Sequence, residues 1–438
     1  MKNIIFLTML LFALAQGSDE VPAPAQDHPI ALTGGTVHTV SGAVIENGMV
    51  LFDNGKILAI GVNLDLPEGT ERIDISGKHV YPALIEANST IGLVEISAVR
   101  ATRDYAESGA VTPEARAEAA FNPDSEILPV TRANGIALAL SVPASGLISG
   151  TSALMMLDGW TWEQMTLKAP VGLHIRWPSI REPDPKQQKS GEIPQYVEEI
   201  DKIRQAFADA RAYHKAQAAQ NDKAIPAHAH LVRWEAMGPV LRGEVPVFVH
   251  ADDIRQIQTA VSWAGEEKLK MVLVGGYDAW RVSELLKEEQ IPVIIAGIHQ
   301  LPNRRWEDYD APFTLPKKLH DAGIKFCIAG SGGAFAAAHA RNLPYEAATA
   351  AAYGLPREVA LQALTLFPAQ ILGVEDRVGS LETGKDATLI VTDGDPLEIV
   401  TRVEMEFIQG RRIDLSSRHT RLYEKYRRKY QQMELLGE

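Results

Sequence analysis

Short apolar runs alternate with amphipathic stretches through the second half of the chain. Four runs have the length of a buried β-strand: residues 245–249, 269–274, 291–296 and 324–329. Stretches with helical spacing of apolar residues, such as 315–322, separate them. Buried strands that alternate with helices are typical of a parallel sheet covered by helices. The pattern therefore predicts an α/β fold.

The part of the chain before residue 245 is less regular. Residues 131–143 and 151–157 predict strands, and residues 195–219 predict one long amphipathic helix. Together with the alternation that follows, these elements favour a TIM-like (β/α)8 barrel over residues 80–370. Such a barrel needs about 250 residues, and the chain of 438 residues is long enough to supply them.

Both ends of the chain predict β structure instead. Residues 29–79 alternate apolar and polar positions and contain Asn47-Gly48 and Asn54-Gly55, and Asn-Gly pairs are strong signals for hairpin turns. A second β-rich segment covers residues 376–412. We expect the two segments to form one small β-sandwich-like sheet domain. Residues 413–438 predict a basic helical tail that lies on the barrel as a solvated amphipathic helix.

Residues 1–15 have the pattern of a secretory signal peptide. Lys2 gives a positive start, residues 4–14 are apolar, and Ala13 and Ala15 form a small-x-small cleavage site. The apolar run is shorter than the roughly 20 residues that span a bilayer, so we expect no membrane insertion after processing. Residues 16–28 read as a polar linker that contains prolines. The sequence thus predicts a secreted or periplasmic protein.

Composition narrows the classes of partner. Hydrophobic residues make up 46% of the chain and charged residues 23%, which is the profile of a globular protein. The formal net charge of -13 disfavours nucleic acid and anionic membranes, because an excess of Lys and Arg is what binds them. A small-molecule substrate or ligand is the expected partner. Cys327 is the single cysteine, and its apolar strand predicts an inert core thiol.

Four segments occur in the order seen in a known family. They are residues 55–61 (GKILAIG), 81–93 (YPALIEANSTIGL), 363–373 (ALTLFPAQILG) and 378–391 (VGSLETGKDATLIV). They resemble the first hairpin, the first barrel strand, the helix after the last barrel strand and the return into the sheet domain of the amidohydrolase superfamily. The resemblance covers residues 30–412 and extends to its metal-dependent, imidazolonepropionase-like hydrolases.

The resemblance implies hydrolysis by a metal-bound hydroxide at the C-terminal mouth of the barrel. The family's ligands are a His-x-His pair on strand one, a carboxylated Lys on strand four, one His on each of strands five and six, and an Asp on strand eight. Only His250, at the end of strand five, matches this pattern. The other five places hold, in strand order, Asn88, Thr90, His174, Gly275 and Ser331.

These replacements remove most of the family's metal-binding groups. Amide and hydroxyl oxygens are weak ligands for a transition metal, whereas imidazole and carboxylate are good ones. We therefore predict His250 and His174 as metal ligands, with either one divalent ion such as zinc or no metal. The resemblance makes this chain a divergent member with depleted ligands.

Further candidates lie beyond the predicted strand ends. Asp252 and Asp278 follow strands five and six, where carboxylates point into a barrel mouth. Each also precedes a predicted helix, whose dipole stabilises an acidic side chain at that end. We favour the helix-terminal interpretation for both and for Asp253. His299 lies on a long loop after strand seven, and long loops often serve as binding surfaces. The candidate cleft residues are Asn88, Thr90, Asp252, Asp278, His299 and Ser331.

Two functions from different classes fit these observations. The first is an exported hydrolase of carbon-nitrogen bonds other than peptide bonds, with an atypical or single-metal site. The second is a catalytically inactive barrel that acts as a binding or partner protein, assembled with itself or with an intact relative. The fold cannot separate them, because barrel folds host many functions. The lost ligands favour the second function, and the resemblance favours the first.

Overall fold

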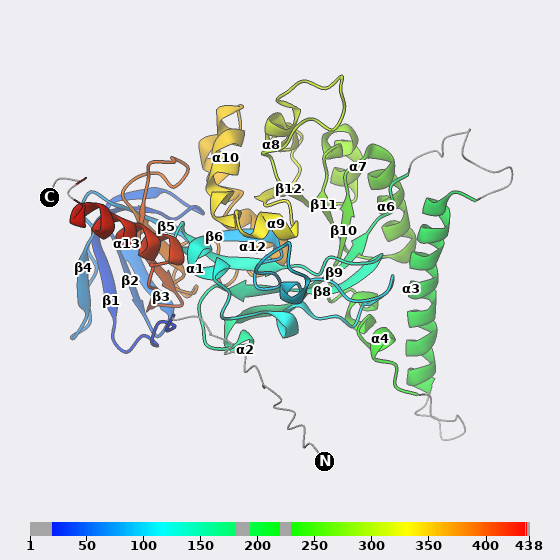
Figure 1. Cartoon of the computed structure of the whole chain (residues 1–438), viewed down its shortest axis with the longest axis horizontal. Helices are drawn as coiled ribbons and strands as arrows, with labels where there is room; N and C mark the ends of the chain where they lie inside the picture. Colours follow the sequence, from blue (N-terminus) through cyan, green and yellow to red (C-terminus); the bar gives the residue numbers. More distant parts are fainter. Residues whose placement is uncertain (1–19, 181–192, 220–228, 434, 436–438) are drawn as a thin grey trace, which may run out of the picture.

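The computed structural model describes residues 20–180, 193–219, 229–433 and 435, so the expected signal peptide at residues 1–15 lies outside the described part. The described strands form two sheets of eight strands each. Figure 1 shows the smaller sheet domain, blue and orange, beside a larger body in which helices surround the second sheet. The predicted α/β fold is confirmed.

The second sheet curves into a nearly closed barrel. Its order is β13-β12-β11-β10-β9-β8-β7-β6. The strands, in chain order, are β6 (Leu84–Ser89), β7 (Ile136–Ser141), β8 (Ile148–Met156), β9 (Thr166–Arg176), β10 (Val247–Ala251), β11 (Met271–Gly275), β12 (Val293–Ala296) and β13 (Phe326–Ala329). Buried apolar residues such as Leu154, Phe248 and Ile294 fill the interior. The four apolar runs recognised in the sequence become β10 to β13.

The uniform (β/α)8 pattern expected from the sequence is interrupted at β8. β6 and β7 pair in parallel, as do β9 to β13, but β8 runs antiparallel to both of its neighbours. Only residues 142–147 separate β7 from β8. So short a connection cannot hold a crossover helix, and antiparallel strands are the neighbours that a short loop can join. Strand-helix alternation is complete only from β9 onward.

The two edge strands of the barrel, β13 and β6, meet at a seam made by side chains. The Glu86 carboxylate accepts the Gly330 N–H at 2.9 Å and the Asn88 N–H at 2.9 Å. The Asn88 amide nitrogen donates to the Gly330 carbonyl at 3.0 Å. Glu86 and Asn88 lie on β6, and Gly330 directly follows β13. These bonds tie the first strand to the last where the backbone ladder does not continue.

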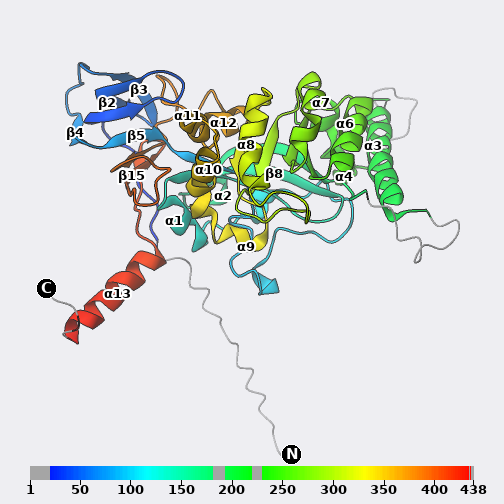
Figure 2. The same ribbon diagram turned by 90° about the horizontal axis from the view of Figure 1, so that it is seen from above.

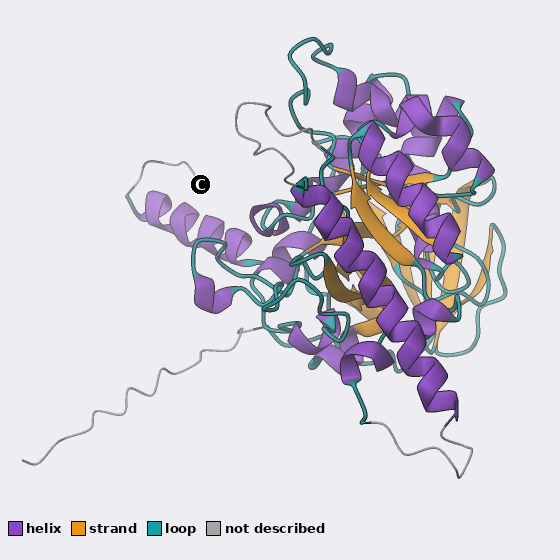
Figure 3. Cartoon of the chain, turned by 90° about the vertical axis from the view of Figure 1, so that its right-hand side faces the viewer, coloured by secondary structure: helices purple, strands orange, loops and turns teal. Residues whose placement is uncertain are grey.

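Helices cover the outside of the barrel (Figure 3). The longer ones are α3 (Gln195–Ala219), α6 (Ile254–Glu267), α8 (Ala311–Asp321) and α10 (Leu343–Ala352). The shorter ones are α1 (Ile127–Arg132), α2 (Trp162–Met165), α4 (Val232–Glu235), α5 (Gly238–Leu241), α7 (Ser283–Glu288), α9 (Ala334–Ala337), α11 (Arg357–Gln362) and α12 (Leu366–Leu372). Four 3₁₀ turns complete the set: η1 (Arg100–Thr102), η2 (Ala117–Ala120), η3 (Ala279–Val282) and η4 (Ala340–Asn342). Trp263 of α6 packs against Phe207 of α3, with ring centroids 5.1 Å apart.

The small domain takes strands from both ends of the chain. They are β1 (Ile30–His38), β2 (Val44–Asp53), β3 (Lys56–Gly61), β4 (Glu71–Asp74), β5 (His79–Pro82), β14 (Leu389–Thr392), β15 (Val403–Ile408) and β16 (Arg411–Arg412). β14 joins the two ends by pairing with β5. All eight strands belong to one hydrogen-bonded sheet, which does not establish the expected β-sandwich-like arrangement.

The two Asn-Gly signals have different outcomes. Asn54-Gly55 connects β2 to β3 as a two-residue hairpin, with both residues at positive φ, as predicted. Asn47-Gly48 makes no turn, because both residues lie inside β2 opposite an irregular part of β1. Asn47 has a φ of 50°, which is the conformation of a bulge as well as of a hairpin turn. The residue pair alone does not distinguish the two.

The C-terminal helix α13 (Arg418–Gln432) leaves the body of the molecule (Figure 2). None of its residues is buried, so the expectation that it lies on the barrel is wrong. Arg421, in the first turn of the helix, contacts Glu126 at 3.7 Å. Among the described helices, none is long and apolar enough to cross a membrane.

A buried ion pair links the small domain to the barrel. Arg411 of β16 contacts the Asp158 carboxylate at 2.6 Å, and Arg132 of α1 lies 3.6 Å from the same group. Asp158 follows β8 and its side chain is only 3% exposed. A buried charge that loses its partner is costly, so Asp158 matters most to Arg411, whereas Arg132 also pairs with Glu20 at 2.6 Å.

We expect Asp158→Asn to lower the free energy of unfolding by about 3 kcal/mol, because it leaves two arginines without their shared carboxylate. Urea denaturation measures the change. Glu244→Gln is the matched control, since Glu244 pairs with Arg242 in solvent and an exposed pair contributes little. Equal effects of the two substitutions would contradict a structural role for the buried pair.

Candidate functional site at the barrel mouth

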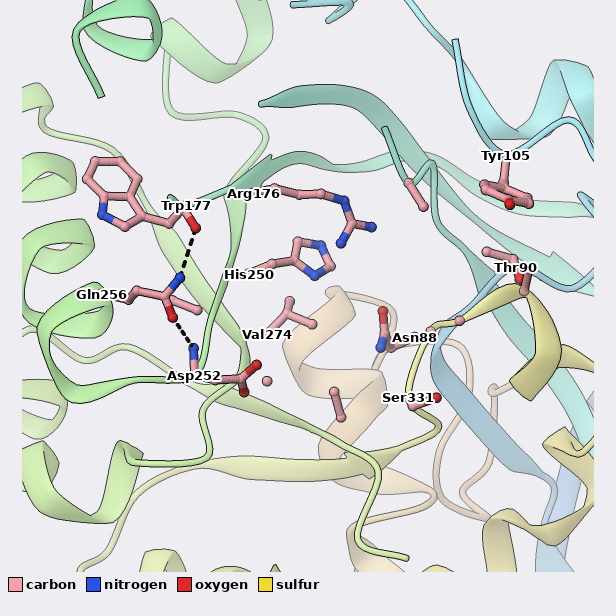
Figure 4. Close-up of a pocket in the computed structure, with 17 residues that line it drawn as sticks. Asn88, Thr90, Tyr105, Arg176, Trp177, His250, Asp252, Gln256, Val274 and Ser331 are labelled. Carbon is pink, nitrogen blue, oxygen red and sulfur yellow. Dashed lines mark hydrogen bonds between the residues drawn. The ribbon is translucent and has the colours of Figure 1, made fainter. Parts of the chain in front are cut away.

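A cavity of about 550 Å³ opens at the C-terminal ends of the barrel strands. Figure 4 shows its lining side chains, which come from β6, β9, β10, β11, β12 and α6 and from loops that include the segment after β13. Five of the residues proposed from the sequence line it: Asn88, Thr90, His250, Asp252 and Ser331. The barrel mouth is therefore the candidate site, as expected for this fold.

His174 and His250 form a hydrogen-bonded pair, of which His250 lines the cavity. They lie on the neighbouring strands β9 and β10, and His174 Nδ1 is 2.9 Å from His250 Nε2. One ring donates to the other, so His174 Nδ1 and His250 Nε2 are both engaged, while each ring keeps its second nitrogen. His174 is fully buried, and its Nε2 has no hydrogen-bond partner among the described residues.

Both imidazoles are held in their neutral forms. Burial, with the nearby Arg176 charge second, lowers the pKa of His174 from 6.5 to about 3. Burial also lowers the pKa of His250 well below 6.5, and the charges of Arg176 and His174 act in the same direction. Two neutral rings that share one hydrogen bond are the arrangement that this environment favours.

Arg176 brings the positive charge of the site. It follows His174 by two residues on β9, so both side chains point to the same side of the sheet. In the β9–β10 ladder Arg176 lies opposite His250, and its guanidinium points into the cavity (Figure 4). No carboxylate lies in ion-pair distance among the described residues, and Nε has no hydrogen-bond partner there. Burial lowers the pKa of Arg176, but a guanidinium stays protonated in proteins.

Asp252 lies at the rim of the cavity on the other side of His250 (Figure 4). Surrounding protein raises the pKa of its carboxyl, with Asp278 repulsion adding to the effect. The Gln256 side chain fixes this corner, because it accepts the Asp252 N–H at 3.2 Å and donates to the Trp177 carbonyl at 3.0 Å. We favoured Asp252 as a helix-terminal acid, but its side chain lines the cavity. Asp253 does cap α6.

Asp278 and His299 do not line this cavity. Asp278 is buried and binds Arg304 at 2.9 Å, within a network that also holds Asp253 and Glu307. Its carboxylate therefore stabilises the loop after β12. His299 lines a neighbouring cavity of about 300 Å³ with Glu86. His299 Nε2 is 2.7 Å from the Thr349 hydroxyl.

The residues present do not fit the family's metal centre. Among the described residues, no group of three or more His, Cys, Asp and Glu side chains is placed to hold a metal ion. The two histidines bond each other, and the Arg176 cation beside them opposes a second cation. Asn88 stands where the family has a metal-binding histidine, and its amide nitrogen donates to the Gly330 carbonyl.

Sequence reasoning missed Arg176 and Glu86. Arg176 could have been found, because a period of two from His174 places it on the same strand face. Glu86 occupies the place of the acid that precedes His-x-His in the family pattern. Its fully buried carboxyl has a pKa raised to about 8, because burial outweighs its backbone hydrogen bonds. It acts in the seam, which depends on a contact between the first and last strands that no local pattern shows.

A family sequence model and a curated protein are similar to this chain. The sequence model described as "Amidohydrolase family" matches residues 313–412. The amidohydrolase tasK of Hapsidospora irregularis is 23% identical over 440 residues, covering 92% of this chain and 43% of that protein. The chain thus spans less than half the length of this curated relative.

Solved structures show the same fold. An amidohydrolase from Thermotoga maritima MSB8 is 27% identical with a TM-score of 0.78, covering 88% of this chain and 99% of that one. A structure described as prolidase eah89906 with N-methylphosphonate-L-proline has 16% identity and a TM-score of 0.54, with coverage of 88% and 99%, and shows the fold alone. Together the three kinds of comparison place this chain in the amidohydrolase superfamily, which confirms the resemblance.

The neutral state of His174 predicts a pH dependence of stability. The folded pKa of about 3 lies below the ordinary 6.5, so the unfolded chain binds the extra proton. The contribution of His174 is therefore complete above pH 6.5 and is lost as the pH falls towards 3. The free energy of unfolding should change by up to about 1.4 kcal/mol per pH unit through His174 alone.

Urea denaturation at pH 7, 6 and 5 measures this slope. We expect His174→Gln to lose less stability on acidification than the unsubstituted protein does. His320→Gln is the control, because His320 is exposed and should leave the slope unchanged. Parallel curves for the His174 variant and the unsubstituted protein would show that the ring is not held neutral.

Proposed function

We propose that this chain is a member of the amidohydrolase superfamily that binds a small molecule at its barrel mouth and does not hydrolyse it by the family's metal mechanism. The observation that carries the proposal is the bond of 2.9 Å between His174 Nδ1 and His250 Nε2. The two remaining imidazoles are engaged with each other. The other ligand places hold Asn88, Thr90 and Ser331, which offer only neutral side-chain oxygens, and Gly275, which offers no side-chain ligand.

The cavity itself supports binding. Its volume of about 550 Å³ lies within the range of small-molecule sites, which is about 300 to 1,000 Å³. Several polar groups converge on it, among them the Arg176 guanidinium and the His250 ring. The Thr90 hydroxyl, also at the cavity, has no hydrogen-bond partner among the described residues. Polar groups at the cavity that lack a protein partner can bond to a polar ligand instead.

A second candidate function is hydrolysis of a carbon-nitrogen bond other than a peptide bond, with a single ion. The favouring observation is that His250 and Asp252 line the same cavity, where the raised pKa of Asp252 suits a proton shuttle. An ion at His250 Nε2 would have to break the bond to His174 and to overcome the Arg176 charge. The binding function needs neither change.

Metal content tests the choice between these functions. We expect the purified protein to hold well under one tightly bound divalent ion per chain, by elemental analysis. We also expect little hydrolysis of amide or ester substrates with zinc added, because imidazole and carboxylate ligands are missing. Two stoichiometric ions that disappear in His250→Ala, but persist in the exposed control His320→Ala, would overturn the proposal.

We further propose that the protein is exported to the periplasm or secreted. Support comes from the charged start and apolar run of residues 1–15. Mass spectrometry of protein from the native cell should find a chain that begins near Gln16. Recovery of intact Met1 from the cytoplasm would contradict export.

Assembly with itself or with an intact relative is the partner proposal. α13 supports it, because Leu422, Tyr426 and Tyr430 are exposed at helical spacing on a helix without buried residues. Light scattering at increasing concentration tests self-association, and a mass of one chain throughout would leave only assembly with a relative.

A further inference from the structure

We infer that Arg176 binds a carboxylate group of the small molecule that occupies the barrel mouth. The inference rests on the proposed binding function and names the chemical class of the ligand. It is carried by a cationic side chain in the cavity wall that has no anionic partner among the described residues.

Other shielded arginines show how this chain compensates such charges. Arg132, 6% exposed at its side chain, pairs with Glu20 at 2.6 Å. Arg304 binds Glu307 at 2.6 Å and also contacts Asp253 and Asp278. Arg176 is also mostly shielded from solvent, but its charge is not compensated in this way. No ion pair or side-chain hydrogen bond joins it to the described residues. An uncompensated cation is costly at such a site unless something else supplies the anion.

The neighbours of Arg176 suit an anion. The His174 and His250 rings are engaged with each other, since His174 Nδ1 lies 2.9 Å from His250 Nε2. The guanidinium offers a planar fork of N–H donors that matches the two oxygens of a carboxylate. Figure 4 places Arg176 beside His250, with Asn88 across the cavity. The free Arg176 donors are thus aimed at the space that a ligand would fill.

A carboxylate suits the charge of the cavity better than phosphate does. Arg176 supplies one positive charge, and Asp252 at the rim supplies a carboxyl group. A phosphate with nearly two negative charges would meet one cation and be repelled by Asp252 when ionised. A monocarboxylate needs one guanidinium only. Asp252 would then face the other end of the ligand, where a hydrogen-bond donor fits.

Matched pairs of small molecules test this inference. Benzoate and benzamide have nearly the same shape, as do acetate and acetamide, but only the first of each pair is an anion. Binding is measured by calorimetry and ligand-observed NMR on the mature protein after treatment with EDTA. We expect a preference of at least about tenfold for the carboxylates, because charge-assisted bidentate bonds are the strong ones.

Substitutions at Arg176 should remove that preference. Arg176→Gln should bind the acid and the amide equally, and Arg176→Lys should keep part of the preference because it keeps the charge without the fork. Arg242→Gln is the matched control, since Arg242 is exposed and lies away from the cavity. The melting temperature of ligand-free Arg176→Gln should equal or exceed that of the unsubstituted protein, because the substitution removes an uncompensated charge.

Several outcomes would overturn the inference. They are equal binding within both pairs, an unchanged preference in Arg176→Gln, tighter Arg176-dependent binding of inorganic phosphate, and a large fall in the melting temperature of Arg176→Gln. A carboxylate preference that appears only with added zinc and survives Arg176→Gln would instead refute the proposed function. Absence of any preference in protein that also holds no metal would refute the inference alone.

Discussion

Closure of the barrel depends on the hydrogen bonds that Glu86 and Asn88 make with the backbone of Gly330. The ladder of eight strands runs from β13 to β6, and these side chains join its two edges. The Glu86 carboxyl is fully buried, so its N–H donors at Asn88 and Gly330 are needed to satisfy it. The strands that carry Asn88, Arg176 and His250 to the mouth belong to this nearly closed barrel.

The seam also engages a residue that stands in a ligand place of the family on the first strand. Asn88 stands where the resemblance implies a histidine, and its amide nitrogen is committed to the Gly330 carbonyl. At the other side of the mouth, His174 and His250 are committed to each other. The positive charge at this mouth is supplied by Arg176, which lines the cavity. The fold is that of the amidohydrolase superfamily, while the residues at its mouth do not match the ligand set of the family's metal centre.

The sequence predicted those parts of the fold that depend on local pattern. The apolar runs became β10 to β13, and the Asn54-Gly55 hairpin formed because both residues tolerate positive φ. The antiparallel course of β8 was missed, since all nine of its residues are buried and a fully buried strand shows no direction. Of the site residues, His250 was found from its strand-end position. Asp278 was misplaced, because its partner Arg304 lies on a distant loop.

The central claim is that the two remaining histidines bond each other in place of a metal ion. The most direct measurement is the ¹⁵N NMR spectrum of the His174 and His250 rings, assigned with single His→Gln variants, before and after zinc is added. We predict two neutral rings with one shared hydrogen bond, and signals that stay unchanged up to a stoichiometric excess of zinc. A shift of His250 Nε2 to the position of a metal-bound nitrogen, with loss of the bond to His174, would contradict the account.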